Sequence, residues 1–171
     1  VWREEGNPNL RIDPYMGTYY YRANVNVKPL DNVKVRKALT YAIDREKLTE
    51  KVTQCGQIPA YSFTPPGAAG WIGDYEDPNT FLDIMRTGRG NNRTGWSNQE
   101  FDELVGKANA TADQQERYRL LGEAEKILID ELPIIPVYTY VRSYQLSPDV
   151  KGYSPNYLDH HHPKTLYLER D

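Results

Sequence analysis

Two stretches rich in tyrosine and β-branched residues, far apart in the sequence, constrain the fold of this chain most. Residues 18–27 read TYYYRANVNV and residues 134–146 read IIPVYTYVRSYQL, and both compositions predict β-strands. Between them, apolar residues recur at helical spacing over 31–52, 78–87, 97–108 and 111–132, whereas TLYLER at 165–170 predicts a last strand. The chain is therefore expected to be α/β or mixed α+β. We interpret most of its 14 tyrosines as strand residues.

Polar residues in front of the helical segments predict where the helices begin. Asp31 or Asn32 is expected to cap the first helix, and Asp44 to cap a second helix in the same stretch. Ser97 and Thr111 are each followed three residues later by Glu or Gln. This spacing fits the capping box, in which both side chains bond to free N–H groups of the first turn.

Size and charge exclude several classes of protein. With 171 residues and 39% hydrophobic content, the chain suits one domain, or one lobe of a larger protein. The net charge is −3 and no basic run is present, so a nucleic-acid partner is not expected. No apolar stretch approaches the length that spans a bilayer. The lone Cys55 excludes an internal disulfide framework and a cysteine-based zinc site.

The segment GWIGDYED at residues 70–77 is the first candidate binding site. Asp77 precedes a proline, which is typical of a helix N-cap. Asp74 lies beside aromatic residues, and a carboxylate in such surroundings suits a cationic group such as an ammonium. The alternative is a structural turn aspartate. A hydrolase that uses Asp74 with Glu76 or Asp77 is a further hypothesis, disfavoured because carboxylates on one short segment do not easily flank a scissile bond.

The run Asp159-His160-His161-His162 is the second candidate site. Adjacent histidines can bind a metal, but they lack the spacing and the partner ligands of known zinc sites. A structural or ligand-lining loop is the favoured interpretation, so no metal or other cofactor is expected. No phosphate-binding loop, dinucleotide fingerprint or Ser-His-Asp order is present. The sequence therefore does not indicate an enzyme.

Several long blocks, in order along the chain, carry a resemblance to a known family. They are DPYMGTYYYRANVNVKPLDNVKVRKALTYAIDREKLT, GQIPAYSFTPPG, GWIGDYEDPNTFL, NNRTGWSNQEFDELV and LPIIPVYTYVRSYQLSPDVKGYSPNYLDHHHPKTLYLE. These blocks resemble the periplasmic oligopeptide-binding proteins of ABC importers, the family 5 extracellular solute-binding proteins. The resemblance implies the C-terminal lobe of a type II periplasmic-binding-protein-like fold, with a mixed sheet flanked by helices. It also implies a second lobe that closes over the ligand.

The resemblance assigns roles to individual residues. Asp74 is expected to take the α-ammonium of a bound oligopeptide, with Trp71, Gly70 and Tyr75 around the adjoining pocket. The peptide is expected to be extended and held through its main chain. His161 and His162 correspond to a ligand-facing loop of the family.

The resemblance also implies partners and a location for the full-length parent. Its partner is expected to be an ABC permease, and its location periplasmic or extracellular, with a lipoprotein anchor in some relatives. The N-terminal residues VWREEGNPNL do not resemble a signal peptide. We therefore expect the chain to be cut from a longer precursor.

An internal deletion is the main departure from the family pattern. In the family a long stretch separates FTPPG from GWIGDY, whereas here residues 67–70, GAAG, join them. We therefore expect residues 1–171 to form a single lobe with a joint at 67–70. Surface exposed by the deletion is expected to favour a homodimer. Two alternatives remain: a folded structural or interaction fragment that has lost ligand binding, and a nickel- or haem-type solute binder of the same family.

Overall fold

The computed structural model describes residues 6–66, 77–156 and 158–170. The strands are β1 (Leu10–Arg22), β2 (Ile58–Pro59), β3 (Ile134–Gln145), β4 (Val150–Lys151) and β5 (Tyr167–Leu168). The α-helices are α1 (Val33–Ala42), α2 (Arg45–Lys47), α3 (Asn79–Leu82), α4 (Gln99–Ala110) and α5 (Gln114–Glu131). Shorter helical turns are the π-helical η1 (Leu48–Thr53) and the 3₁₀ turns η2 (Asp83–Met85) and η3 (Pro163–Thr165).

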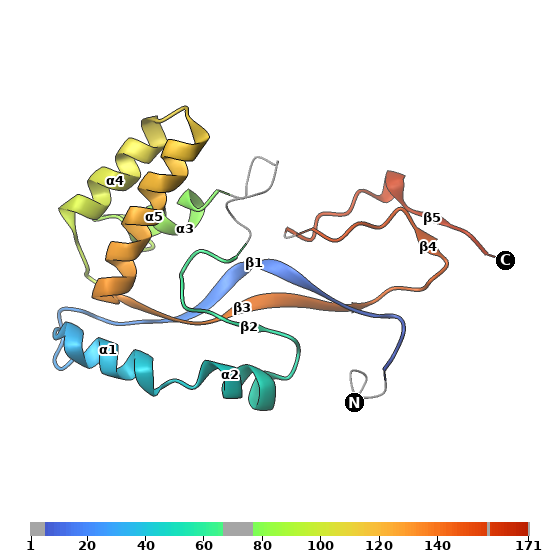
Figure 1. The fold of residues 1–171 in the computed structure, drawn as a ribbon, viewed down its shortest axis with the longest axis horizontal. Coiled ribbons are helices and arrows are strands. Elements are labelled where there is room, and N and C mark those ends of the chain that lie inside the picture. Colours follow the sequence, from blue (N-terminus) through green and yellow to red (C-terminus); the bar gives the residue numbers. More distant parts are fainter. Residues whose placement is uncertain (1–5, 67–76, 157, 171) are drawn as a thin grey trace.

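A long antiparallel pair of strands, β1 with β3, forms an arm through the molecule. The sheet order is β1-β3-β2, β4 pairs with β5 in a separate sheet, and every strand pair among the described residues is antiparallel. Figure 1 shows α1 and α2 on one side of the arm, α3, α4 and α5 on the other, and β4 and β5 beyond its far end. The predicted strand at 134–146 is confirmed, whereas the strand expected at 18–27 begins and ends earlier, at Leu10 and Arg22.

The arm is irregular in the middle of β1. The register between β1 and β3 shifts between Pro14 and Thr18 and again between Tyr19 and Tyr20. Such bulges bend a strand and increase its local twist. Gly17 lies within the first irregularity, where an added Cβ would stand 3.0 Å from the ring of Tyr140. The absence of a side chain at this position therefore lets the two strands approach closely.

The N-cap residues of two helices are those predicted from the sequence, and the N-cap residues of two other helices differ from the prediction. Asn32 accepts a hydrogen bond from the backbone N–H of Lys34 and Asp44 from that of Lys47, so the predicted division into two helices is confirmed. The capping-box predictions at Ser97 and Thr111 are wrong, because the side chains of Asn98 and Asp113 accept the capping bonds. Each of these neighbours offers a side-chain oxygen, and Asn and Asp cap at least as well as Ser and Thr.

The core lies where α3, α4 and α5 meet the base of the arm. Its buried residues include Phe63, Leu82, Phe101, Leu121 and Ile134. Tyr20 joins them from β1, with its ring centroid 4.9 Å from that of Phe63. Within the described ranges no helix has both the length and the apolar character needed to cross a bilayer.

Two buried arginines attach the N-terminal helices to the rest of the fold. Arg36 and Arg45 are 4% and 3% exposed, and burial lowers the pKa of both guanidinium groups. Arg36 donates to the carbonyl of Glu131 from Nε at 2.9 Å. Arg45 donates from Nε to the carbonyls of Ala60 and Pro136, each at 2.9 Å. These bonds tie α1 and α2 to the end of α5, to β3 and to the chain after β2.

Candidate ligand-binding site

The segment that the sequence marks as the ammonium site is not part of the structural description. Asp74, Trp71, Gly70 and Tyr75, and the joint at 67–70, lie outside the described residues. Their roles therefore stay predictions. The structure does place the residues on either side, which determine where this segment leaves and rejoins the fold.

Both sides of the segment are anchored to α5. Before it, the Glu125 carboxylate accepts hydrogen bonds from the backbone N–H groups of Phe63 and Thr64 at 2.8 and 2.7 Å. After it, Asp77 accepts from the N–H of Asn79 at 2.8 Å and from Nε of Arg117 at 2.7 Å. The predicted capping bond of Asp77 is present, although α3 begins at Asn79. One helix therefore holds the chain on both sides of residues 67–76.

Four tyrosines cover one face of the arm. Tyr19 stacks on Tyr138 with ring centroids 4.9 Å apart, and Tyr21 and Tyr140 contact this pair edge-on. Tyr21 and Tyr140 are 55% and 38% exposed. Burial and the neighbouring tyrosines raise the pKa of the Tyr138 hydroxyl. Tyrosine combines an apolar ring with a polar hydroxyl and is enriched at binding surfaces, so this face is a candidate contact for a ligand.

The sequence interpretation missed this tyrosine face, because it assigned most of the tyrosines to strand propensity and did not place any of them at a binding surface. The available signal was their alternation, since Tyr19 and Tyr21, like Tyr138 and Tyr140, are two residues apart. Residues at this spacing share one face of a strand. The register pairs Tyr19 with Tyr138, so the two sets meet on the same side of the sheet.

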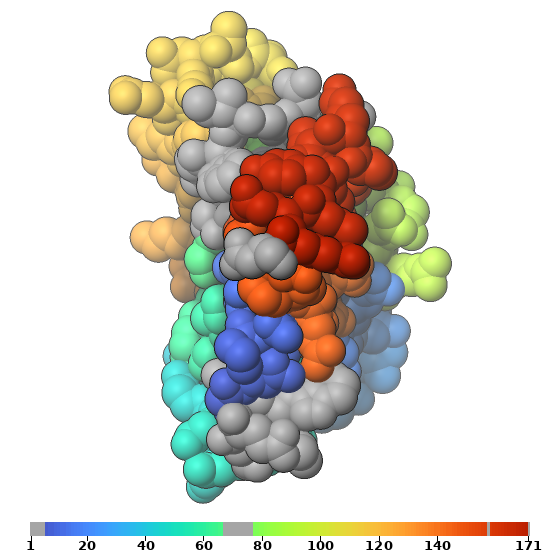
Figure 2. Space-filling view, turned by 90° about the vertical axis from the view of Figure 1, so that its right-hand side faces the viewer, coloured from blue at the N-terminus to red at the C-terminus, as the bar shows by residue number. Residues whose placement is uncertain are grey.

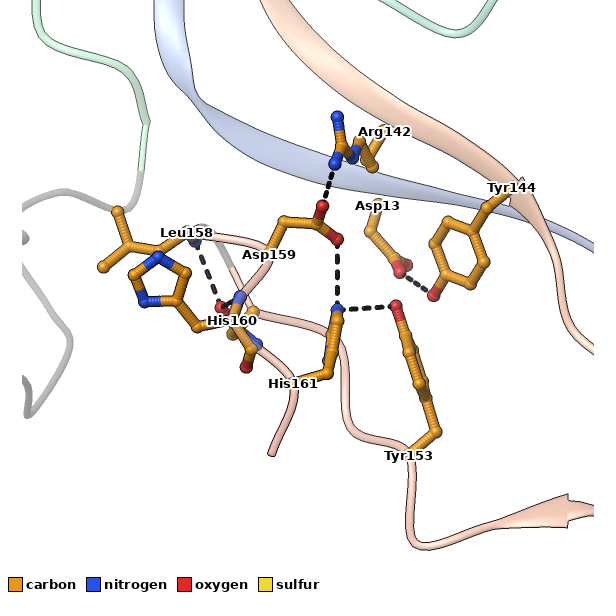
Figure 3. Close-up of polar contacts among 9 residues, drawn as sticks. Asp13, Arg142, Tyr144, Tyr153, Leu158, Asp159, His160 and His161 are labelled. Carbon is orange, nitrogen blue, oxygen red and sulfur yellow. Dashed lines mark hydrogen bonds and ion pairs between the residues drawn. The ribbon is translucent and has the colours of Figure 1, made fainter. Parts of the chain in front are cut away.

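The C-terminal loop is joined to β3 through a chain of polar side chains (Figure 3). Arg142 of β3 forms an ion pair with Asp159. Asp159 in turn lies 3.0 Å from Nε2 of His161, which lies 2.9 Å from the hydroxyl of Tyr153. Burial acts to raise the pKa of Asp159, but hydrogen bonds from His161 and Arg142 outweigh it and hold that pKa below its usual value.

A second contact closes this chain of side chains back onto the arm. The ring of Tyr153 lies 5.3 Å from the ring of Tyr144 on β3. The Tyr144 hydroxyl donates to Asp13 of β1. The pKa of Tyr144 is raised, mainly because the hydroxyl is buried and to a smaller extent because of this hydrogen bond. Figure 2 views this end of the molecule, where the red C-terminal residues lie in front of the arm. The loop is therefore held to β3 at two positions on the same face.

The two histidines predicted to face the ligand differ in their surroundings. The side chain of His161 is 20% exposed and stacks on Tyr153, with centroids 4.2 Å apart. His162 is exposed at the start of η3. In the part of the chain that the structure describes, no group of three or more His, Cys, Asp or Glu side chains is placed to hold a metal ion. The histidine run is thus built into a loop network.

Comparison with known proteins identifies the family. Residues 1–118 match the model of the bacterial extracellular solute-binding proteins, family 5 Middle. The chain is 27% identical over 238 residues to the oligopeptide-binding protein OppA of Bacillus subtilis, covering 84% of this chain and 44% of that protein. It is also 27% identical over 254 residues to the periplasmic oligopeptide-binding protein OppA of Salmonella typhimurium, covering 94% and 47%. The chain thus spans about half the length of the curated relatives it matches.

Solved structures confirm the fold predicted from the sequence. The Escherichia coli murein tripeptide binding protein MppA aligns with a TM-score of 0.82 at 22% identity, over 99% of this chain and 52% of that one. Haemophilus influenzae OppA in complex with RPPGFSPFR aligns with a TM-score of 0.79 at 23% identity, over 98% and 51%. Fold and family model agree, and the chain belongs to the family 5 bacterial extracellular solute-binding proteins.

Proposed function

We propose that this chain is part of the solute-binding component of a peptide ABC importer and that the tyrosine face contacts an extended oligopeptide. Proteins of its family bind solutes for transport and are not enzymes. The observation that carries the proposal is the exposure of Tyr21 and Tyr140 on the arm, beside a stacked pair of rings. Relatives named for oligopeptide binding support the choice of ligand.

In this proposal Asp74 binds the α-ammonium of the peptide, and Trp71, Gly70 and Tyr75 form the adjoining pocket. The peptide main chain supplies most of the remaining contacts. His161 and His162 lie on the loop that faces the ligand, with His161 held in place by Asp159. No cofactor takes part.

The affinity of the isolated chain is expected to be low. An ion pair in water contributes about 0–1 kcal/mol, whereas truncating one partner of a buried pair costs about 2–5 kcal/mol. Asp74 can have the stronger interaction only when an opposing lobe excludes water from the ammonium. Without that lobe we expect a peptide Kd of about 1 mM or weaker, which corresponds to about 4 kcal/mol of binding free energy.

A shortened lobe accounts for the lengths of the matches. The alignment to the Bacillus subtilis protein runs over 238 residues yet includes 84% of this 171-residue chain. The relative therefore has residues within the aligned stretch that have no counterpart here. We place the omission at residues 67–70 and regard residues 1–171 as one lobe with a joint there. Surface exposed by the omission would favour a homodimer.

The full-length parent would work with an ABC permease in the periplasm or at the outer cell surface. Relatives named as periplasmic support this location. A chain that spans about half of its relatives is also compatible with a folded fragment that no longer binds peptide. A peptide titration distinguishes a lobe that binds peptide from a folded fragment that does not.

The test is an NMR titration of the chain with trialanine and with N-acetyltrialanine. Binding is expected to shift the amide signals of Trp71, Tyr75 and the tyrosine face with the free amine and much less with the acetylated peptide. Asp74→Asn should remove this difference. Asp130→Asn, an exposed aspartate on α5, serves as the matched control and should leave the difference unchanged. A folded chain whose signals move with neither peptide would refute peptide binding by this chain.

A further inference from the structure

A cavity beside α5 is lined by none of the four tyrosines of the tyrosine face. Its volume is about 260 Å³, close to the lower end of the range for small-molecule sites. Its walls come from α5 and from the chain on both sides of residues 67–76. The lining residues are Thr64, Pro65, Pro66, Pro78, Tyr118, Leu121, Gly122 and Glu125. The walls are thus mostly proline rings, a tyrosine and a leucine.

Glu125 is the one ionisable carboxylate among these lining residues. Its Oε1 accepts the backbone N–H groups of Phe63 and Thr64, and the side chain of Thr64 also acts on this carboxylate. Burial raises the pKa of this carboxyl group, although hydrogen bonds from Thr64 and Phe63 act in the opposite direction. No described lysine, arginine or histidine forms an ion pair with it. A half-buried carboxylate without a cation is costly, and a cation in the cavity would lower that cost.

We propose that this cavity binds a guanidinium or ammonium group carried on a short alkyl stem. The cation would pair with Oε2 of Glu125, and the stem would lie against the proline rings and Leu121. Arginine and lysine side chains have this combination of an apolar stem and a charged end. The ring of Tyr118 adds a surface on which a planar guanidinium can lie.

The cavity can be closed without removing its carboxylate. Gly122 lines it and faces open space, since a Cβ added to this residue would have no neighbouring atom within 4 Å. It lies inside α5, where glycine is a poor helix former. Gly122→Leu should therefore keep the helix and fill the cavity, whereas Glu125→Gln keeps the shape and removes the charge.

The experiment titrates the chain with Nα-acetylarginine amide and with its neutral isostere, Nα-acetylcitrulline amide, observed by amide NMR. Neither probe has a free α-ammonium, so failure of this proposal leaves the proposed function of Asp74 untouched. Amide shifts at Thr64, Tyr118 and Glu125 are expected with the arginine probe. The citrulline probe should bind with an affinity at least about tenfold lower, as expected for loss of a charge-assisted hydrogen bond. Butylguanidinium shows whether the cation alone is sufficient or a peptide unit is needed.

Three variants test whether binding of the arginine probe depends on the Glu125 charge and on the open cavity. Glu125→Gln and Gly122→Leu should each abolish the difference between the two probes. Glu123→Gln, which changes an exposed acid paired with Arg119, is the matched control on the same helix and should bind as the unmodified chain does. Equal binding of both probes, no binding of the arginine probe, or unchanged binding by Gly122→Leu would overturn the proposal.

Discussion

Replacing Arg45 tests whether a buried guanidinium joins the N-terminal helices to the arm. Its side chain donates to the carbonyls of Ala60 and Pro136 inside the fold, and to those of Thr40 and Ile43 at the end of α1. Arg45→Met keeps a long apolar stem but removes every donor. The two inner carbonyls then lose their partners where water does not easily replace them.

The magnitude follows from the number of carbonyls left unpaired. Leaving a buried acceptor without a donor costs about 1–3 kcal/mol, so the inner pair predicts a loss of about 2–6 kcal/mol of unfolding free energy. Arg45→Lys retains a charge and can reach one of the two carbonyls, so it should lose about half as much. A lysine cannot supply the planar fork that holds both.

Urea unfolding followed by circular dichroism measures the effect. Arg119→Met is the matched control, because Arg119 lies on the surface of α5 with a half-exposed side chain and forms ion pairs with Glu116 and Glu123. Exposed ion pairs contribute about 0–1 kcal/mol. The reasoning would be refuted if Arg45→Met lowered the unfolding free energy by no more than the Arg119 control does.

Three further outcomes are expected. Burial raises the folded-state pKa of Glu125 above its usual value, so this group stabilises the fold at low pH and its contribution is lost as pH rises through the raised pKa. Urea midpoints relative to Glu125→Gln should therefore fall as pH rises above the usual glutamate pKa, and a difference that stays constant with pH would contradict this. Residue 159 has a backbone φ of +57°, a conformation that asparagine adopts as readily as aspartate. Asp159→Asn should therefore lower the free energy of unfolding by about 1 kcal/mol or less, as measured by thermal unfolding. The loss should disappear at acid pH, since the Asp159 pKa is lowered; a loss that persists there would count against the ion pair with Arg142. Gly56→Ala should lower the free energy of unfolding by about 1–3 kcal/mol, more than Gly88→Ala does. Both glycines have positive φ, but a Cβ at Gly56 would lie 2.7 Å from a β1 side chain, whereas a Cβ at Gly88 would meet no atom within 4 Å. Equal losses would refute the steric argument.

Local patterns in the sequence were sufficient to predict most elements of secondary structure. The strand at 134–146, the division of the first helical stretch at Asp44 and the capping bond of Asp77 were all predicted and are present. The starting residues of α4 and α5 were wrong by one or two positions. Neighbouring polar residues compete for the same N–H groups, and backbone geometry decides between them.

The length of β1 could not be read from its own sequence. Its first half contains Asp13 and Pro14, which do not favour a strand, yet these residues pair with Arg142 and Val141 of β3. A long regular partner therefore extends the strand beyond the segment with strand propensity. The same pairing places Tyr20 in the core and Tyr19 and its partners outside.

Helical and strand periodicities and the order of motifs are local properties of a chain, so the class of fold, the family resemblance and the candidate residues could be inferred from the sequence. The tertiary structure was needed to show that the two tyrosine pairs meet on one face, that Arg142 pairs with Asp159 and that Glu125 lines a cavity. These contacts join residues from distant parts of the sequence. They depend on strand register and on the bulges in β1, and a shift of one residue in a strand turns its side chains to the opposite face.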